Sequence, residues 1–215
     1  MPSVIYFSNS FNYGLALNAQ GHIREVKMSL PTTAATTLAN CKKYLNIGNS
    51  DTSKDDLIEL LIEATTNAAE EYLGRNIVAR QITQEPYDCT NSKSKYLQLK
   101  QYPVTTLTTI VEDGETLDTT ALKIDNSNGI IKRPTFWKGA VLVTYTAGIA
   151  SSTANVPKNL QLAIWQWVSY LLNTQESQGI DSETLGDYSV NYLEQNQEIP
   201  STVSSLLEGY RRIDL

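Results

Sequence analysis

The sequence contains one histidine, His22, and two cysteines, Cys41 and Cys89, among 215 residues. Two thiols far apart in the chain form neither a disulfide scaffold nor a zinc site, so we expect both to be free. A single histidine provides too little material for a histidine-rich metal site or for most acid–base relays. The phosphate-binding patterns GxxxxGK[ST] and GxGxxG are absent. We therefore predict no metal, no cofactor and no catalytic residue, with His22 in a loop.

Long apolar runs are also missing. Hydrophobic residues make up 41% of the chain and charged residues 19%, and polar residues interrupt the apolar stretches every few positions, which excludes both disorder and a membrane span. Residues 4–7 lack the flanks and length of a secretory signal, so we expect the protein to stay in the cell that makes it. A net charge of -6 argues against nonspecific attraction of the whole molecule to nucleic acid.

The first part of the chain alternates polar and apolar residues. Residues 13–17 and 22–26 are predicted to pair as a hairpin. A short helix is predicted over residues 36–45, ending by Gly48.

A long helix is predicted from Asp51 or Ser53, as the N-cap, to a stop at Gly74. Two carboxylates, Asp55 and Asp56, suit the positive end of its dipole. Apolar residues at helical spacing predict its buried stripe. The stripe consists of Leu57, Leu61, Ala64, Ala68 and Tyr72, widened by Ile58, Ile62 and Leu73.

Residues 77–146 change to short β-like runs separated by turn signals. Asp113-Gly114 and Asn128-Gly129 accept the positive φ angles of tight hairpins, so we predict at least two hairpins. The predicted strands are residues 77–83, 96–99, 107–111, 121–124, 130–131 and 140–146.

A second long helix is predicted after Pro157, because proline is tolerated in a first turn. Residues 159–175 contain no charge, so we expect another chain to cover the outer face of this helix. Trp165 and Tyr170 fall outside its apolar face. That face is formed by Leu160, Ala163, Ile164, Trp167, Val168, Leu171 and Leu172.

The end of the chain is predicted to contain a polar linker over residues 173–187, a short strand over 188–192 and a helix from Pro200. Arg211 and Arg212 suit the negative end of that helix dipole. Its apolar side consists of Val203, Leu206, Leu207 and Tyr210.

This order of elements predicts an α+β fold in which a β-rich insertion lies between the second helix and the long third helix. The predicted helical domain comprises residues 28–76 and 150–215, and the β-rich insertion comprises 77–149. Residues 1–27 are an N-terminal extension that we interpret as a β arm reaching a neighbouring subunit, or as a tail from an upstream start.

Several short motifs occur in one order along residues 28–215. They are Thr37-Leu38, Lys43-Tyr44-Leu45, Asp55-Asp56-Leu57, Leu61-Ile62-Glu63-Ala64, Glu71-Tyr72-Leu73-Gly74-Arg75, Tyr102-Pro103-Val104, Tyr145-Thr146-Ala147-Gly148, Val156-Pro157, Leu185-Gly186-Asp187-Tyr188-Ser189-Val190, Ile199-Pro200, Val203, Leu206-Leu207 and Tyr210-Arg211-Arg212. In this order the chain resembles the head-tail connector family of tailed phages, including the related adaptors of gene transfer agents. Residues 1–27 depart from the family pattern.

The resemblance implies a structural, non-enzymatic adaptor. Such adaptors form a homo-oligomeric ring, which we expect to be dodecameric, beneath the portal protein. The ring extends the channel through which packaged DNA passes without specific binding, and it docks a stopper or tail-completion protein. The implied location is the head–tail interface of a virion, after assembly in the host cytoplasm, with no membrane contact.

Candidate partner-binding residues are aromatic or cationic and lie in the last third of the chain, since such residues are enriched at interfaces. Trp165 is assigned to an interface and Trp167 to the core, while compensation of a helix end explains the two arginines almost as well as docking on the portal. The candidates are Trp165, Tyr170, Tyr188, Tyr210, Arg211 and Arg212.

Asp55, Glu59 and Glu63 recur every four residues, so they are candidates for lining the DNA channel. A solvated helix face is the more ordinary reading of this spacing. Carboxylates spaced along one helix do not surround a single point, so these three residues cannot form a calcium site.

Two other functions remain open on the sequence. A carbohydrate- or protein-binding β module would explain 12 tyrosines against 3 phenylalanines, because tyrosine combines a stacking surface with a hydroxyl. It leaves the charge-free helix unexplained. A hydrolase with paired carboxylates is compatible with the many Asp and Glu residues, although no acid pair is marked by its context.

Overall fold

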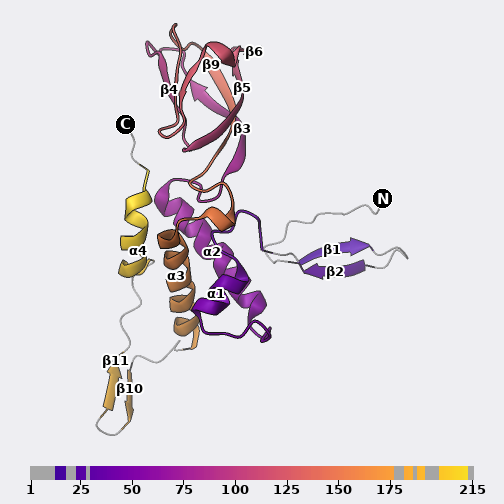
Figure 1. Cartoon of the computed structure of the whole chain (residues 1–215), viewed down its shortest axis with the longest axis vertical. Coiled ribbons are helices and arrows are strands. Elements are labelled where there is room, and N and C mark those ends of the chain that lie inside the picture. Colours follow the sequence, from indigo (N-terminus) through magenta and orange to yellow (C-terminus); the bar gives the residue numbers. More distant parts are fainter. Residues whose placement is uncertain are drawn as a thin grey trace.

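The computed structural model describes residues 13–17, 23–27, 30–176, 182–185, 188–191 and 199–212. Four α-helices gather at one end of the molecule, and a β-rich region lies at the other (Figure 1). The β-rich region is inserted between α2 and α3, which confirms the predicted α+β fold and the position of the insertion.

The first helix, α1 (Leu38–Tyr44), starts where its sequence predicts. Thr37 is its N-cap, and the Thr37 hydroxyl accepts a hydrogen bond of 3.3 Å from the backbone N–H of Asn40. This bond satisfies one of the N–H groups that a helix start leaves unpaired. The helix ends at Tyr44, with Leu45 as its C-cap, and Asn46 takes a positive φ of 59°, so the chain turns before it reaches the predicted stop at Gly48.

The second helix, α2 (Asp55–Leu73), starts later than predicted. Neither Asp51 nor Ser53 caps it, because Lys54 occupies the N-cap position without a side-chain bond. The Asp51 carboxylate accepts instead from the N–H and hydroxyl of Ser53, at 3.0 and 2.6 Å, in the preceding loop. Gly74 ends α2 with a φ of 64°, as predicted for a left-handed C-terminal position.

The buried face of α2 contains Ile58, Ile62 and Leu73, which the predicted stripe included, but not the five residues at its centre. Ala64 is exposed, while Leu57, Leu61, Ala68 and Tyr72 are half-buried. The core face lies about one position further along the helix, because α2 packs against both α1 and α3. It consists of Ile58, Glu59, Ile62, Thr65, Thr66, Ala69, Glu70 and Leu73.

The central helix is α3 (Lys158–Glu176), which lies between α2 and α4 (Ser201–Leu207) (Figure 1). Every residue from Leu160 to Leu172 is buried or half-buried. Its own chain therefore covers much of this charge-free helix, and cover of its half-buried side by another chain stays a prediction. Buried side chains of α2, α3 and α4 share one core with Cys41, whose thiol is free and has its pKa raised to about 12 by burial.

The β-rich region consists of two antiparallel sheets. One has the order β3 (Arg80–Asp88), β9 (Ala140–Ala147), β5 (Val104–Glu112) and β6 (Glu115–Thr116); the other has the order β4 (Tyr96–Gln98), β8 (Ile130–Lys132) and β7 (Lys123–Asp125). The strands overlap all six predicted runs except that residues 119–121 form a 3₁₀ turn. A second core, separate from that of the helices, lies between the sheets, and it includes the free Cys89.

Both predicted hairpin turns are present. Asp113 and Gly114 have positive φ angles of 49° and 88° and connect β5 to β6. Gly129, with a φ of 66°, precedes β8 in the turn from β7. Asp and Gly are residue types that accept the left-handed backbone conformation found at these three positions.

Two further hairpins lie outside the main sheets (Figure 1). The pair β1 (Tyr13–Leu17) and β2 (Ile23–Lys27) confirms the first predicted hairpin, shifted by one residue in its second strand. The other pair is β10 (Ser182–Leu185) and β11 (Tyr188–Asn191), so part of the predicted linker is a strand. His22 and most of the remaining linker lie outside the described residues. Pairing of the first hairpin with a neighbouring subunit stays a prediction.

An ion pair in the β-rich region joins β5 to the segment after β8. The guanidinium of Arg133, which is 7% exposed, donates to both carboxylate oxygens of Glu112 at 2.9 and 2.6 Å. The guanidinium also lies 4.2 Å from the ring centre of Trp137. Hydrogen bonds from Arg133 and from the backbone N–H of Lys138 hold the pKa of Glu112 below its usual 4.5.

Replacing Glu112 with glutamine should lower the free energy of unfolding by about 3 kcal/mol, because Arg133 then remains buried without its counter-charge. Because the folded pKa of Glu112 is lowered, its stabilisation is present above pH 4.5 and is lost as the pH falls below that value. Urea unfolding should show the largest gap between wild type and variant near neutral pH and a shrinking gap in acid. The exposed Glu71→Gln on α2 is the matched control and should behave as wild type. If Glu112→Gln lowered the stability no more than this control does, the prediction would be refuted.

Candidate functional site

The chain crosses between the helical and β-rich regions twice, and the two crossing segments pair with each other. The backbone N–H of Ala79 donates to the Ala150 carbonyl at 2.7 Å, and that of Ala150 donates to the Ile77 carbonyl at 2.8 Å. Gly148 lies so close to this crossing that an added Cβ would stand 2.4 Å from the Ala79 Cα. Only glycine fits there. We call this crossing, with the contacts around it, the joint.

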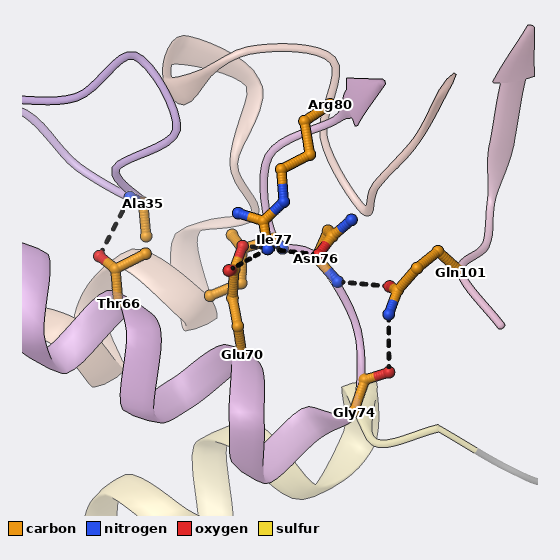
Figure 2. Close-up of polar contacts among 8 residues, drawn as sticks. All are labelled: Ala35, Thr66, Glu70, Gly74, Asn76, Ile77, Arg80 and Gln101. Atoms are coloured by element: carbon orange, nitrogen blue, oxygen red, sulfur yellow. Dashed lines mark hydrogen bonds and ion pairs between the residues drawn. The ribbon is translucent and has the colours of Figure 1, made fainter. Parts of the chain in front are cut away.

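The centre of the joint is the carboxylate of Glu70, near the end of α2 (Figure 2). One oxygen accepts from the backbone N–H of Ile77 at 2.8 Å, and the other accepts from the Arg80 guanidinium at 2.9 Å. Arg80 also donates to the side-chain oxygen of Asn76 at 2.6 Å. Glu70 is only 8% exposed, so its charge is stabilised by these donors rather than by water. The helix end is thereby tied to the first strand of the β-rich region.

Gln101, in the loop between β4 and β5, forms a second tie (Figure 2). Its side-chain oxygen accepts from the backbone N–H of Asn76 at 2.8 Å, while its amide group donates to the Gly74 carbonyl at 3.4 Å. Its backbone N–H donates to the Tyr145 hydroxyl at 3.1 Å, and that hydroxyl donates to Glu85 at 2.7 Å. Burial raises the pKa of Tyr145, so the phenol stays protonated and keeps donating.

Arg75 links three parts of the chain. Its guanidinium donates twice to the Tyr102 carbonyl, at 3.0 and 2.9 Å, and once to the Tyr210 carbonyl at 3.3 Å. It also lies 4.3 Å from the centre of the Tyr102 ring. Burial lowers the pKa of Arg75, but an arginine remains charged at any physiological pH. The end of the chain is thus held against both regions.

The C-terminal residues close the joint from the helical side. The backbone N–H of Arg212 donates to the Leu73 carbonyl at 2.8 Å and so pairs one of the free carbonyls at the end of α2. The Tyr72 hydroxyl donates to the Glu208 carboxylate at 2.7 Å. Arg211 is largely exposed and lies 3.8 Å from Glu208. Of the two predicted arginines, Arg211 therefore leaves its cation more accessible to a partner.

The aromatic candidates have partners within their own chain. Trp165 donates from its indole nitrogen to the Thr36 hydroxyl at 2.8 Å and stacks on Tyr44 with ring centres 5.6 Å apart. Tyr170 is half-buried against the helical core. Tyr188 starts β11, opposite Leu185. Binding of another protein by these residues stays a prediction.

The three acidic candidates on α2 do not form one exposed row. Asp55 pairs at 2.7 Å with the ammonium group of Lys42, whose side chain is 3% exposed. Glu59 is buried, and Glu63 is half-buried. A uniformly solvated face is therefore wrong for this trio, and channel lining stays a prediction.

The described part of the chain contains neither a metal site nor a membrane-spanning helix. No group of three His, Cys, Asp or Glu residues there is arranged to hold a metal ion. No helix among those residues has the length and hydropathy needed to cross a membrane.

Residues 34–213 match the model of the head completion protein family. The chain belongs to that family. Membership confirms the resemblance to head-tail connectors and makes this protein a structural component of the head–tail region of a phage or phage-like particle. No curated protein matches the sequence.

Solved structures share the fold at low sequence identity. A chain from the neck of an empty gene transfer agent particle, computed with C6 symmetry, is 18% identical with a TM-score of 0.60, over 87% of this chain and 94% of that chain. A chain of the native gene transfer agent virion is 16% identical with a TM-score of 0.58, over 87% and 94%. A chain from the native neck, computed with C12 symmetry, is 16% identical with a TM-score of 0.56, over 87% and 93%.

The joint gives a physical reason for several of the motifs that suggested the family. Gly74 and Arg75, Tyr102, Gly148, and Tyr210 to Arg212 belong to separate motifs and meet in this one place. The sequence did not single out Glu70, Asn76 or Gln101. In the sequence, Glu70 looks like any polar residue on a helix surface, and Asn76 and Gln101 look like ordinary loop residues.

Replacing Glu70 with alanine should lower the free energy of unfolding by about 2 kcal/mol, because the buried N–H of Ile77 loses its acceptor. Glu70→Gln should recover part of this loss, since its amide oxygen can still accept that bond. Chemical unfolding and small-angle scattering should report reduced stability and a wider range of angles between the two regions. The neighbouring exposed Glu71→Ala is the control, and an equal effect there would contradict a specific role for Glu70.

Proposed function

We propose that this protein forms a ring in the neck of a phage-like particle, beneath the portal, where it extends the DNA channel and docks the next stopper or tail component. The observation that supports this most strongly is the fold shared with neck chains over nearly the whole of both chains. The C6 and C12 symmetry of those necks supports a closed ring. The proposal includes no catalytic step.

The joint is consistent with such a role. A ring subunit must hold its two contact surfaces at a fixed angle, because each copy meets the next through different faces and the rotation has to close. Three separate ties, through Glu70, Gln101 and Arg75, fix the angle between the two regions of this chain. They lie on different elements, so loss of one leaves the others in place.

The solvent side of α2 provides a candidate contact between neighbouring subunits. Leu60 is 46% exposed, and Ala64 one turn further is exposed as well. Leu57 and Leu61 are half-buried beside them. The described part of the chain covers this apolar strip only in part, and the strip suits burial against the helical region of the next copy.

Replacing Leu60 with lysine should leave the monomer folded, with native circular dichroism, and should prevent ring formation and head–tail joining. The physical reason is that a cation would be buried in an apolar contact without a partner. Native mass spectrometry, electron microscopy and an infectivity or transfer assay measure the two outcomes.

The exposed Asn91→Lys, in the loop between β3 and β4, is the charge-matched control away from this face of α2 and should assemble normally. Rings and joining at wild-type levels in Leu60→Lys would refute the proposed contact. Deletion of the gene tests the proposed function itself. The expected result is DNA-filled heads without tails, and normal tailed particles would overturn the proposed function.

The alternative of a sugar-binding module is not favoured. Tyr102 and Tyr145 are buried and engaged in the joint. Tyr44 and Tyr96, which are 42% and 54% exposed, lie on the helical and β-rich regions respectively. They cannot form one stacking platform.

A further inference from the structure

Charge is unevenly distributed along this acidic protein. Residues 77–149 contain eight Lys and Arg and seven Asp and Glu, whereas the rest of the chain contains nine and sixteen. Within the β-rich region the basic residues gather further. Residues 93–100 and 123–138, which include the three-stranded sheet, hold seven of the eight basic residues and only one acid, Asp125.

One face of this sheet presents a row of exposed side chains. Lys132 on the central strand β8 lies directly opposite Tyr96 on β4 and Lys123 on β7. All three side chains are exposed, whereas the next row, Leu97 and Ile131, points into the core. The lysines are therefore displayed to solvent by a rigid, hydrogen-bonded sheet rather than by a loop.

Aromatic rings contact two of the lysine cations of this face. The Lys132 ammonium lies 5.1 Å from the centre of the Tyr96 ring. At the end of the same sheet, the Lys95 ammonium lies 5.7 Å from the centre of the Phe136 ring. Tyr96 and Phe136 are about half exposed. Such contacts restrict the lysine side chains and reduce the entropy that they lose when an anion binds.

The arrangement is unfavourable for the isolated protein. Like charges directly opposite one another on neighbouring strands destabilise a sheet, and Lys123 and Lys132 are such a pair. No carboxylate of the described residues lies within 4.0 Å of Lys95, Lys123 or Lys132 as an ion pair. An external anion would relieve this repulsion.

We propose that this basic face, defined by Lys95, Tyr96, Lys123, Lys132 and Phe136, contacts the phosphate backbone of duplex DNA without reading its sequence. Phosphate contacts are made mainly by lysine and arginine. Lysine is depleted in protein–protein interfaces, whereas three lysines lie on this face and two of them are packed on its aromatic rings. The inference rests on the proposed function for the source of the DNA, which is the molecule in the neck channel. The remaining acidic surface would keep the contact local and weak.

The test is binding of the full-length protein to a short fluorescent duplex, measured by anisotropy as the salt concentration is raised. Wild type should bind, with an affinity that falls steeply with salt and is the same for two unrelated sequences. The triple variant Lys95→Gln, Lys123→Gln and Lys132→Gln should bind at least tenfold more weakly. Its slope of log affinity against log salt should decrease by about 2 to 3, because up to three phosphate contacts are lost.

The control is a triple variant of equal charge on the helical region, made by replacing Lys43, Lys54 and Lys158 with glutamine. It should bind DNA nearly as wild type does, and circular dichroism should show that both variants are folded. Equal loss in both variants would overturn the inference, because net charge alone would then explain binding. Absence of binding by wild type at low salt would overturn it too.

Competition with polyglutamate separates DNA from an acidic protein partner. Polyglutamate should displace the duplex poorly, and displacement as efficient as by unlabelled duplex would overturn the assignment to DNA. Ring formation by the first triple variant should remain normal. Intact rings together with lost DNA binding in this variant support the inference. Failure of the wild-type protein to form rings counts against the proposed function, whereas the inference on DNA is decided by the binding measurements alone.

Discussion

The buried carboxylate of Glu70 is the contact on which the arrangement of the two regions depends. It accepts hydrogen bonds from the backbone of Ile77 and from Arg80, at the point where the chain leaves α2. A carboxylate buried without donors would be strongly unfavourable, so it keeps its place only while both partners stay in position. The two hydrophobic cores, which share no residue, are thereby held in one orientation.

The other ties of the joint reinforce this orientation from different parts of the sequence. Arg75 reaches the loop before β5 and the C-terminal segment with one guanidinium, whose fixed fork of donors suits several carbonyls at once. Arg212 completes the end of α2 through its backbone. An adaptor in a ring needs this rigidity, since a small change of angle in each copy would accumulate around the circle.

The distribution of charge gives the two regions different surfaces. The helical region is acidic and supplies an apolar strip around Leu60, which suits contact with another copy. The three-stranded sheet presents lysines in register, supported by Tyr96 and Phe136. A predominantly negative molecule with one local basic face would meet DNA at a defined place without gripping it along the whole surface.

The sequence by itself determined the order of elements, the end of α2 at Gly74 and the hairpin turn at Asp113, because helical spacing and positive φ angles are local properties. It did not determine which face of α2 is buried, since apolar residues surround that helix and only packing against α1 and α3 selects Ile58 over Ala64. It also could not show that Glu70 and Arg75 meet groups from distant segments. Those contacts form only when two separate cores have folded, so the tertiary structure alone decided the joint.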